Sequence, residues 1–166
     1  MADVAQIVIA GVGNELLSDD GVGIHAIREL QKNPIPGVAA VEIGTAILHG
    51  LHFLESAKRV LVIDAAMGGQ PPGTIYQFDP AQKGEVKSLT SIHAMGLHEA
   101  MRFLQPANTL PCVTVVGVEP KSIEYSMNLS VPVQRALPQV VSLVRELVLG
   151  WVRAEIPCAS ESAARL

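Results

Sequence analysis

Three ionisable side chains stand where predicted strands and helices meet, and their types suit metal or acid–base chemistry. Glu15 lies in a glycine-rich turn after the first apolar run, Asp64 follows the β-forming residues 60–63, and His93 stands near the start of a predicted helix. Two carboxylates and one imidazole can bind a divalent transition metal that keeps open coordination positions. The same groups can instead act as acid and base on a water molecule. The residue types leave both chemistries open.

The position of His93 on its helix supports an inward-facing role. Leu97, Ala100 and Met101 repeat at helical spacing, and His93 precedes Leu97 by four residues, so it lies on the same inward stripe. His98 directly follows Leu97 and points about 100° away. The helix dipole disfavours a positive charge at a helix N-terminus, which predicts a neutral imidazole that is able to bind a metal.

Structural roles compete with each of these interpretations. An aspartate that ends a strand, such as Asp64, is about as often a turn or capping residue as a functional one. A single histidine on a helix face is more often structural than a ligand. Asp19 and Asp20 directly precede a predicted helix, so capping of that helix is their predicted role.

Strand and helix patterns alternate along the chain. Strands are predicted at residues 6–10, 38–43, 59–65, 74–78 and 111–118, and helices from 22 to a stop before Pro34 and at 46–57, 91–104 and 130–149, with Gly150 as the last stop signal. This order predicts a three-layer α/β/α fold with a mostly parallel, doubly wound twisted sheet of about five strands. Sites in such sheets lie outside the carboxyl ends of the strands, near the point where strand order reverses.

Length and charge limit the classes of partner. The chain has 166 residues, which predicts one domain over residues 1–153 and a flexible tail over 154–166. The net charge is −4 with no basic cluster, which argues against a nucleic-acid partner. Charged residues interrupt the apolar stretch 129–152, which predicts a packed helix and no membrane span. The first residues lack the pattern of a signal peptide, so we expect a cytoplasmic protein, and we expect a monomer.

A nucleotide-binding module is the alternative suggested by the turn Gly11–Gly13. That turn begins a dinucleotide-binding fingerprint, but Leu16 occupies the position of the third glycine. Glu15 would also repel a pyrophosphate. No Gly-Lys-Ser/Thr element follows, so a P-loop is excluded and no nucleotide cofactor is expected.

Several segments, in this order, resemble those of a known family. Residues 11–23, GVGNELLSDDGVG, resemble the N-terminal signature of the [NiFe]-hydrogenase maturation endopeptidases. Residues 61–65 are similar to the second acidic segment of that family, and residues 91–97 to its Ser-x-His-x-x-Gly-Leu segment. Residues 117–120 and 129–130 resemble the closing motifs of the family. The resemblance covers the chain from about Ile7 to Leu149.

The resemblance implies a specific proteolytic function. Members of this family remove a C-terminal extension from the hydrogenase large subunit once nickel is installed. It therefore implies an endopeptidase whose partner is the large-subunit precursor and whose nickel is supplied by that substrate, held by its cysteines. The nickel-recognising and catalytic positions of the family fall on Glu15, Asp64 and His93. The metal, or one of the carboxylates, would activate water for attack on the scissile bond.

The sequence lacks the signatures of other protease classes. The chain contains neither the His-Glu-x-x-His pattern of helix-borne zinc proteases nor the Gly-x-Ser-x-Gly elbow of serine hydrolases. A chaperone that binds the metal centre without cutting the chain is a further alternative, because the same three side chains could recognise nickel without cleavage.

Overall fold

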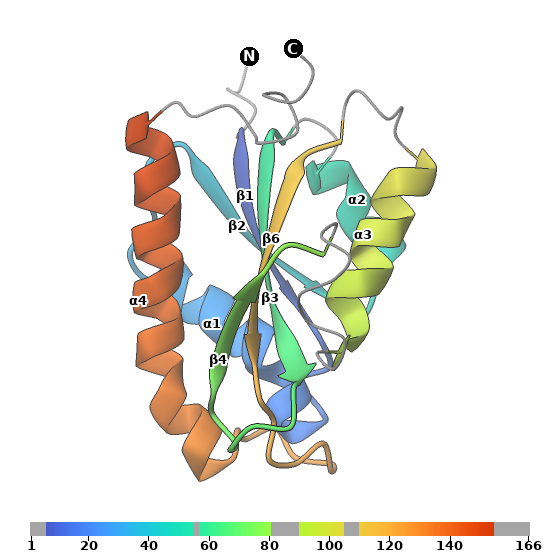
Figure 1. Ribbon diagram of the computed structural model, residues 1–166, viewed down its shortest axis with the longest axis vertical. Helices are drawn as coiled ribbons and strands as arrows, with labels where there is room; N and C mark the ends of the chain where they lie inside the picture. Colours follow the sequence, from blue (N-terminus) through green and yellow to red (C-terminus); the bar gives the residue numbers. More distant parts are fainter. Residues whose placement is uncertain (1–5, 55–56, 81–89, 105–109, 155–166) are drawn as a thin grey trace.

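A twisted sheet lies between two pairs of helices in the computed structural model, which describes residues 6–54, 57–80, 90–104 and 110–154 (Figure 1). The strands are β1 (Ile7–Val12), β2 (Val38–Gly44), β3 (Arg59–Met67), β4 (Ile75–Phe78), β5 (Thr90–Ser91) and β6 (Cys112–Val118). The main sheet has the order β2-β1-β3-β6-β4, and only β4 runs antiparallel to its neighbour within it. The predicted α/β fold with a mostly parallel sheet is confirmed.

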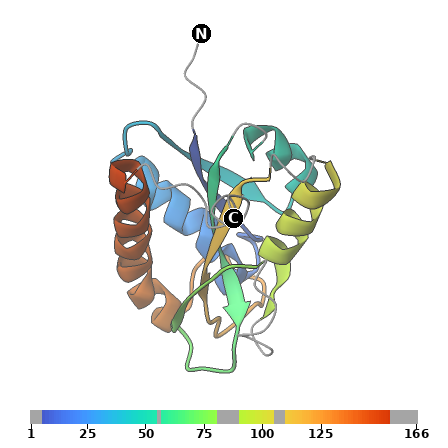
Figure 2. The ribbon, with the colours of Figure 1, turned by 45° about the horizontal axis from the view of Figure 1, so that its top comes forward.

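The helices cover both faces of the sheet. They are α1 (Val22–Gln31), α2 (Ile47–Leu54), α3 (Ile92–Leu104) and α4 (Val131–Ala154), and the short 3-10 helix η1 (Ser18–Gly21) precedes α1. Helices α1 and α4 lie on one face, and α2 and α3 lie on the other (Figures 1 and 2). The molecule therefore has the three layers that the alternating pattern predicts.

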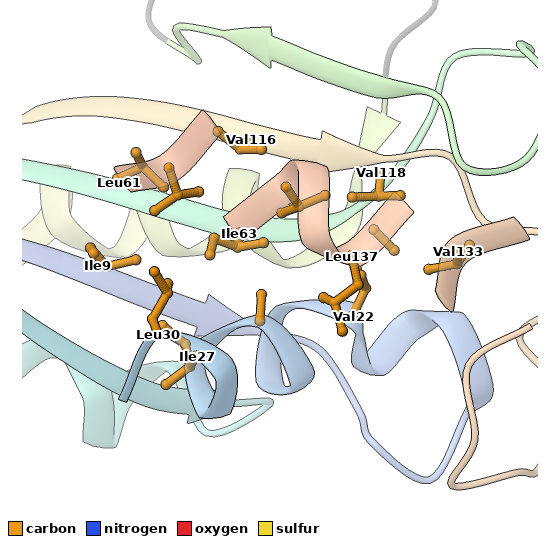
Figure 3. Packing of buried hydrophobic residues seen from close by; sticks show 14 of the residues in the cluster. Ile9, Val22, Ile27, Leu30, Leu61, Ile63, Val116, Val118, Val133 and Leu137 are labelled. Atoms are coloured by element: carbon orange, nitrogen blue, oxygen red, sulfur yellow. The ribbon is translucent and has the colours of Figure 1, made fainter. Parts of the chain in front are cut away.

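The central strand β3 is buried on both faces, which explains its unbroken run of apolar residues. Leu61 and Ile63 pack toward α1 and α4, where they join Ile27 in one hydrophobic cluster (Figure 3). Val60 and Val62 point the other way and pack in the cluster beneath α2 and α3. All four strand residues are fully buried, so the sheet edge just beyond them is held in a fixed position.

The order of the strands reverses between β1 and β3. Strand β1 pairs with β2 on one side and with β3 on the other, and its last pair with β3 joins Gly11 to Ile63. Asp64 lies one residue beyond that pair, still in register with Gly117 of β6. Asp64 therefore lies at the switch point of the sheet, although β3 continues for three further residues to Met67.

Three elements differ from the sequence-based prediction, and one of them is α2, which ends at Leu54 rather than at residue 57. Helix α4 continues past Gly150, because Trp151 packs against the core and its ring lies 5.1 Å from the guanidinium carbon of Arg59. The short strand β5 was not predicted. The predicted tail lies outside the described residues, apart from Ala154, which ends α4. In the described ranges, no helix is long and apolar enough to cross a membrane.

Candidate active site

Asp64 is a fully buried carboxylate that is held by the start of α3. Its Oδ2 accepts hydrogen bonds from the backbone N–H groups of His93 at 3.1 Å and Ala94 at 3.0 Å, and from the Ser91 hydroxyl at 2.5 Å. Its Oδ1 accepts from the N–H of Ala65 and lies 3.2 Å from His93 Nδ1. The first N–H groups of a helix have no partner within the helix, and a negative charge near them is stabilised. Asp64 therefore fixes both the start of α3 and the imidazole of His93.

The surroundings of His93 raise the pKa of its imidazole, an effect opposite in direction to that of the helix dipole. The hydrogen bond to Asp64 raises the pKa of His93 most strongly, burial opposes this, and the charges of Asp64 and Asp20 raise the pKa further. The net shift is upward because two carboxylates face the ring. The side chain is 17% exposed, so the ring remains accessible at the sheet edge.

Asp20 stands beside the same imidazole, although the sequence does not assign it to the site. Its Oδ1 lies 3.8 Å from His93 Nδ1, and its Oδ2 accepts a hydrogen bond from the N–H of Asn14 at 2.8 Å. The N-cap residues of η1 and α1 are Leu17 and Gly21, and neither cap involves a side-chain hydrogen bond. The predicted capping role of Asp20 is therefore wrong. The available signal was an acidic residue in the turn that enters α1 at the switch point.

Glu15 points into a different cluster. Its carboxylate accepts a hydrogen bond from Arg28 at 2.8 Å, and Arg28 also binds both carboxylate oxygens of Glu42 at 3.0 and 3.1 Å. These two carboxylates raise the pKa of Arg28, with the hydrogen bond to Glu42 as the largest cause. The structure thus brings Asp64 and His93 together and places Asp20, rather than Glu15, in contact with the pair. Among the described residues, no three His, Cys, Asp or Glu side chains form a metal-holding group.

Asp19 joins the turn after β1 to the segment after β6. Its buried carboxylate accepts hydrogen bonds from the N–H groups of Lys121 at 2.8 Å and Ser122 at 3.0 Å. It also accepts from both the N–H and the hydroxyl of Ser130 at 2.7 Å, directly before α4. The capping role predicted for Asp19 is therefore wrong, because its partners belong to a distant segment.

Glu119 secures a third segment at the same edge. Its carboxylate, at the end of β6, accepts hydrogen bonds from the Tyr76 hydroxyl at 2.5 Å and the N–H of Gly68 at 2.7 Å. Burial alone would raise the pKa of Glu119, but the hydrogen bonds from Tyr76 and from the backbone of residues 68–70 together lower it. Burial and the hydrogen bond to Glu119 raise the pKa of Tyr76 to about 12. The loop after β3 is thereby held beside the candidate site.

The glycine-rich turn packs against the turn that carries Asp20. A phosphate would need free backbone N–H groups there, but the carboxylate of Asp20 already accepts the hydrogen bond of Asn14 N–H. Gly13 has φ of 115°, and a Cβ atom at this position would come within 1.9 Å of the carbonyl oxygen of Asp20. The glycine serves the close packing of two turns, which argues against the nucleotide-binding alternative.

Comparison with known proteins decides the family. A family model described as hydrogenase maturation protease matches residues 24–147. The chain belongs to the hydrogenase maturation protease family. The match begins after the turn that carries Glu15 and Asp20, and it includes Asp64 and His93. The chain is therefore a peptidase by family, which agrees with the resemblance of its motifs.

Individual members of the family are similar over most of their length. The hydrogenase expression/formation protein HoxM of Cupriavidus necator is 30% identical over 163 residues, which cover 95% of this chain and 81% of HoxM. The hydrogenase 2 maturation protease of Escherichia coli is 29% identical over 150 residues, which cover 85% of this chain and 92% of that protein.

Solved structures of maturation proteases share the fold. The maturation protease HybD from Thermococcus kodakarensis superposes with a TM-score of 0.73 at 27% identity, covering 86% of this chain and 98% of that one. The maturating endopeptidase HybD from E. coli gives a TM-score of 0.75 at 25% identity, covering 87% and 93%.

Proposed function

We propose that the protein is an endopeptidase that removes the C-terminal extension of a [NiFe]-hydrogenase large subunit after nickel insertion. The observation that carries this proposal is the Asp64–His93 pair, held at the switch point of a hydrogenase maturation protease fold. A carboxylate and an imidazole at an exposed sheet edge can bind a metal or move a proton. We place the reaction in the cytoplasm, with a monomeric enzyme and no nucleotide cofactor.

The nickel ion arrives with the substrate, and the protease completes its coordination. Asp64 and His93 are two of the proposed recognition residues. The sequence resemblance proposes Glu15 as the third, whereas the geometry favours Asp20, because Asp20 lies beside His93 and Glu15 is bound to Arg28. A site that lacks a complete set of protein ligands suits a metal that is already held by another chain, because the missing ligands come from the substrate.

Recognition of the metal makes cleavage conditional on nickel insertion. A precursor without nickel offers no cation to the acidic edge and is held less tightly. The nickel ion supplies Lewis-acid chemistry when it is bound. When a neutral His93 binds the metal, a neighbouring carboxylate can accept a proton from the attacking water and pass it to the leaving amine as the peptide bond breaks.

The proposal is tested with purified precursor in nickel-loaded and nickel-free forms. Truncation of the precursor is followed by mass, and we expect only the nickel-loaded form to lose its extension. Equal cleavage of both forms would rule out nickel recognition. Binding of the loaded precursor without truncation would support the chaperone alternative. Binding of NAD or ATP in a separate titration would support the nucleotide alternative.

A further inference from the structure

Exposed apolar side chains are concentrated at one end of the molecule. In the described part of the chain, nine large hydrophobic side chains are exposed. Seven of them lie on segments at the carboxyl ends of the strands, namely Leu16, Leu48, Met67, Ile123, Tyr125, Met127 and Val131. Phe53 and Val152 lie in the last turns of α2 and α4, at the opposite end of the sheet. These side chains lie at the same end of the sheet as the candidate site, and exposed apolar side chains gathered in one region are typical of a protein-binding face.

Four of these side chains lie on two segments that are hydrogen-bonded to each other, and we name them the apolar strip: Leu16, Ile123, Tyr125 and Met127. Leu17 and Ser126 form a parallel β-bridge, and Ser126 N–H donates to the carbonyl of Leu16 at 3.0 Å. Leu16 and Tyr125, one residue before each bridged residue, therefore lie side by side. Figure 1 shows the two segments together at the lower edge, below the arrowhead of β3.

The strip is built on a fixed support. The N–H of Ser18 donates to the carbonyl of Ser126 at 2.7 Å, and the Ser18 hydroxyl donates to the carbonyl of Asn128 at 3.0 Å. The buried carboxylate of Asp19 holds the start of the same segment at Lys121 and Ser122. Ser18 and Asp19 are buried and Ser122 and Ser126 are half-buried, while Tyr125 is 90% exposed. A preformed surface binds a partner with a small loss of conformational entropy.

The size and charge of the strip identify the kind of occupant. Four side chains that are half to nine-tenths exposed present on the order of 500 Å² of surface, as large as the functional apolar patches of ordinary monomers. A stable dimer needs roughly 800 Å² from each partner, so a second copy is not the occupant. Lys121 and Glu124, both exposed, place opposite charges beside the strip, which gives no net attraction for phosphate groups. A peptidase binds a polypeptide transiently, and this surface suits that use.

We propose that the apolar strip binds an apolar segment of the protein substrate and thereby holds the scissile region beside His93. This inference rests on the proposed function, because it takes the large-subunit precursor as the occupant. Asp19 and Asp20 are consecutive residues, so the strip and the imidazole share one support. The strip sets the affinity for the substrate and takes no part in the chemistry.

The first test separates affinity from turnover. The double variant Tyr125→Ser/Met127→Ser is compared with the matched control Phe53→Ser/Val152→Ser in processing of nickel-loaded precursor. We expect the strip variant to raise KM about tenfold or more, because it loses apolar contact area with the bound substrate. The kcat should stay within about twofold, because the strip takes no part in the chemistry. The control should leave both constants unchanged. Equal effects of the two variants, or an unchanged KM in the strip variant, would overturn the proposal.

The second test measures whether substrate binding protects the strip in the unmodified protein. Amide exchange of Tyr125 and Met127 is measured by NMR with and without precursor, and we expect binding to slow their exchange. Cleavage without this protection would overturn the strip and leave the protease function standing. Protection without cleavage would support the strip and overturn the protease function. Absence of both cleavage and protection would overturn both.

Discussion

Two clusters of acidic and basic side chains lie near the same region of the sheet, and they differ chiefly in burial. In the first cluster, Asp64 is fully buried and accepts hydrogen bonds from two segments while it holds His93. In the second, Arg28 binds Glu15 and Glu42, and all three side chains are between 34% and 45% exposed. Buried charges without good partners are expensive, whereas exposed ion pairs contribute little. The structure therefore constrains the first cluster and leaves the second free to vary.

The largest effect is expected from Asp64→Asn. The new amide NH₂ would face backbone N–H groups that now donate to a carboxylate, so we expect a loss of about 2–4 kcal/mol in the free energy of unfolding. Precursor processing should fall by about 10³-fold or more, because His93 loses the group that orients it. Chemical denaturation and mass analysis of the precursor measure the two effects. A variant of unchanged stability would show that the buried cluster is no more constrained than the exposed one.

The second prediction compares the two candidates for the third recognition residue. Asp20→Asn should lower processing by about 100-fold or more, because Asp20 faces His93. Glu15→Gln should leave processing within about threefold, because the carboxylate of Glu15 is directed to Arg28. Both changes are isosteric, so each serves as the control for the other. The reverse order of effects would restore Glu15 as the recognition residue.

The third prediction concerns protonation along α3. In metal-free protein, the NMR titration of His93 should have its midpoint above 6.5, and that of His98 should lie below 6.5. The hydrogen bond to Asp64 raises the pKa of His93, whereas burial and then the charge of Arg102 lower that of His98.

A raised pKa in the folded state stabilises the fold fully below pH 6.5. That stabilisation is lost as pH rises through the folded midpoint of His93. Asp64→Asn should remove most of the upward shift. Equal midpoints for His93 and His98 in the unmodified protein would contradict the assigned environments.

The smallest effect is expected from Arg28→Gln in the exposed cluster. Exposed ion pairs contribute about 0–1 kcal/mol, so the free energy of unfolding should change by no more than that. The difference from the unmodified protein should shrink further in concentrated salt, because salt screens surface charges. Thermal unfolding at two salt concentrations measures both. A loss of more than about 2 kcal/mol would show that this cluster carries more of the stability than its exposure indicates.

Much of the fold follows from periodicity in the sequence. The apolar run 60–63 identifies a strand buried on both faces, and the sheet indeed covers it with helices on each side. The apolar run and the helix phase predict that Asp64 and His93 meet at the sheet edge, and their side chains lie 3.2 Å apart in the structure. Both inferences depend on residues within about one helical turn. The predicted end of α4 was wrong, since Trp151 makes contacts with the core that a local stop signal cannot reveal.

The parts that could not be predicted depend on long-range partners. Asp19 and Asp20 look alike in the sequence, and local rules assign helix capping to both. The actual partners of Asp19 lie 102 to 111 residues away, and Asp20 faces His93 across the switch point. The upward shift of the His93 pKa could not be predicted for the same reason, since two carboxylates approach the ring from other elements.

The hydrogen bonds of Asp19 also bear on how the protein is made at the ribosome. The N-terminal motif leaves the ribosome first, but the donors that satisfy its buried carboxylate include Ser130, more than a hundred residues later. Until Ser130 emerges, the carboxylate of Asp19 stays hydrated, because burying it without its hydrogen-bond donors would cost free energy. The turn after β1 therefore does not reach its folded conformation before then. The edge that carries Asp20 is therefore among the last parts of the domain to take shape, and an interrupted nascent chain lacks it.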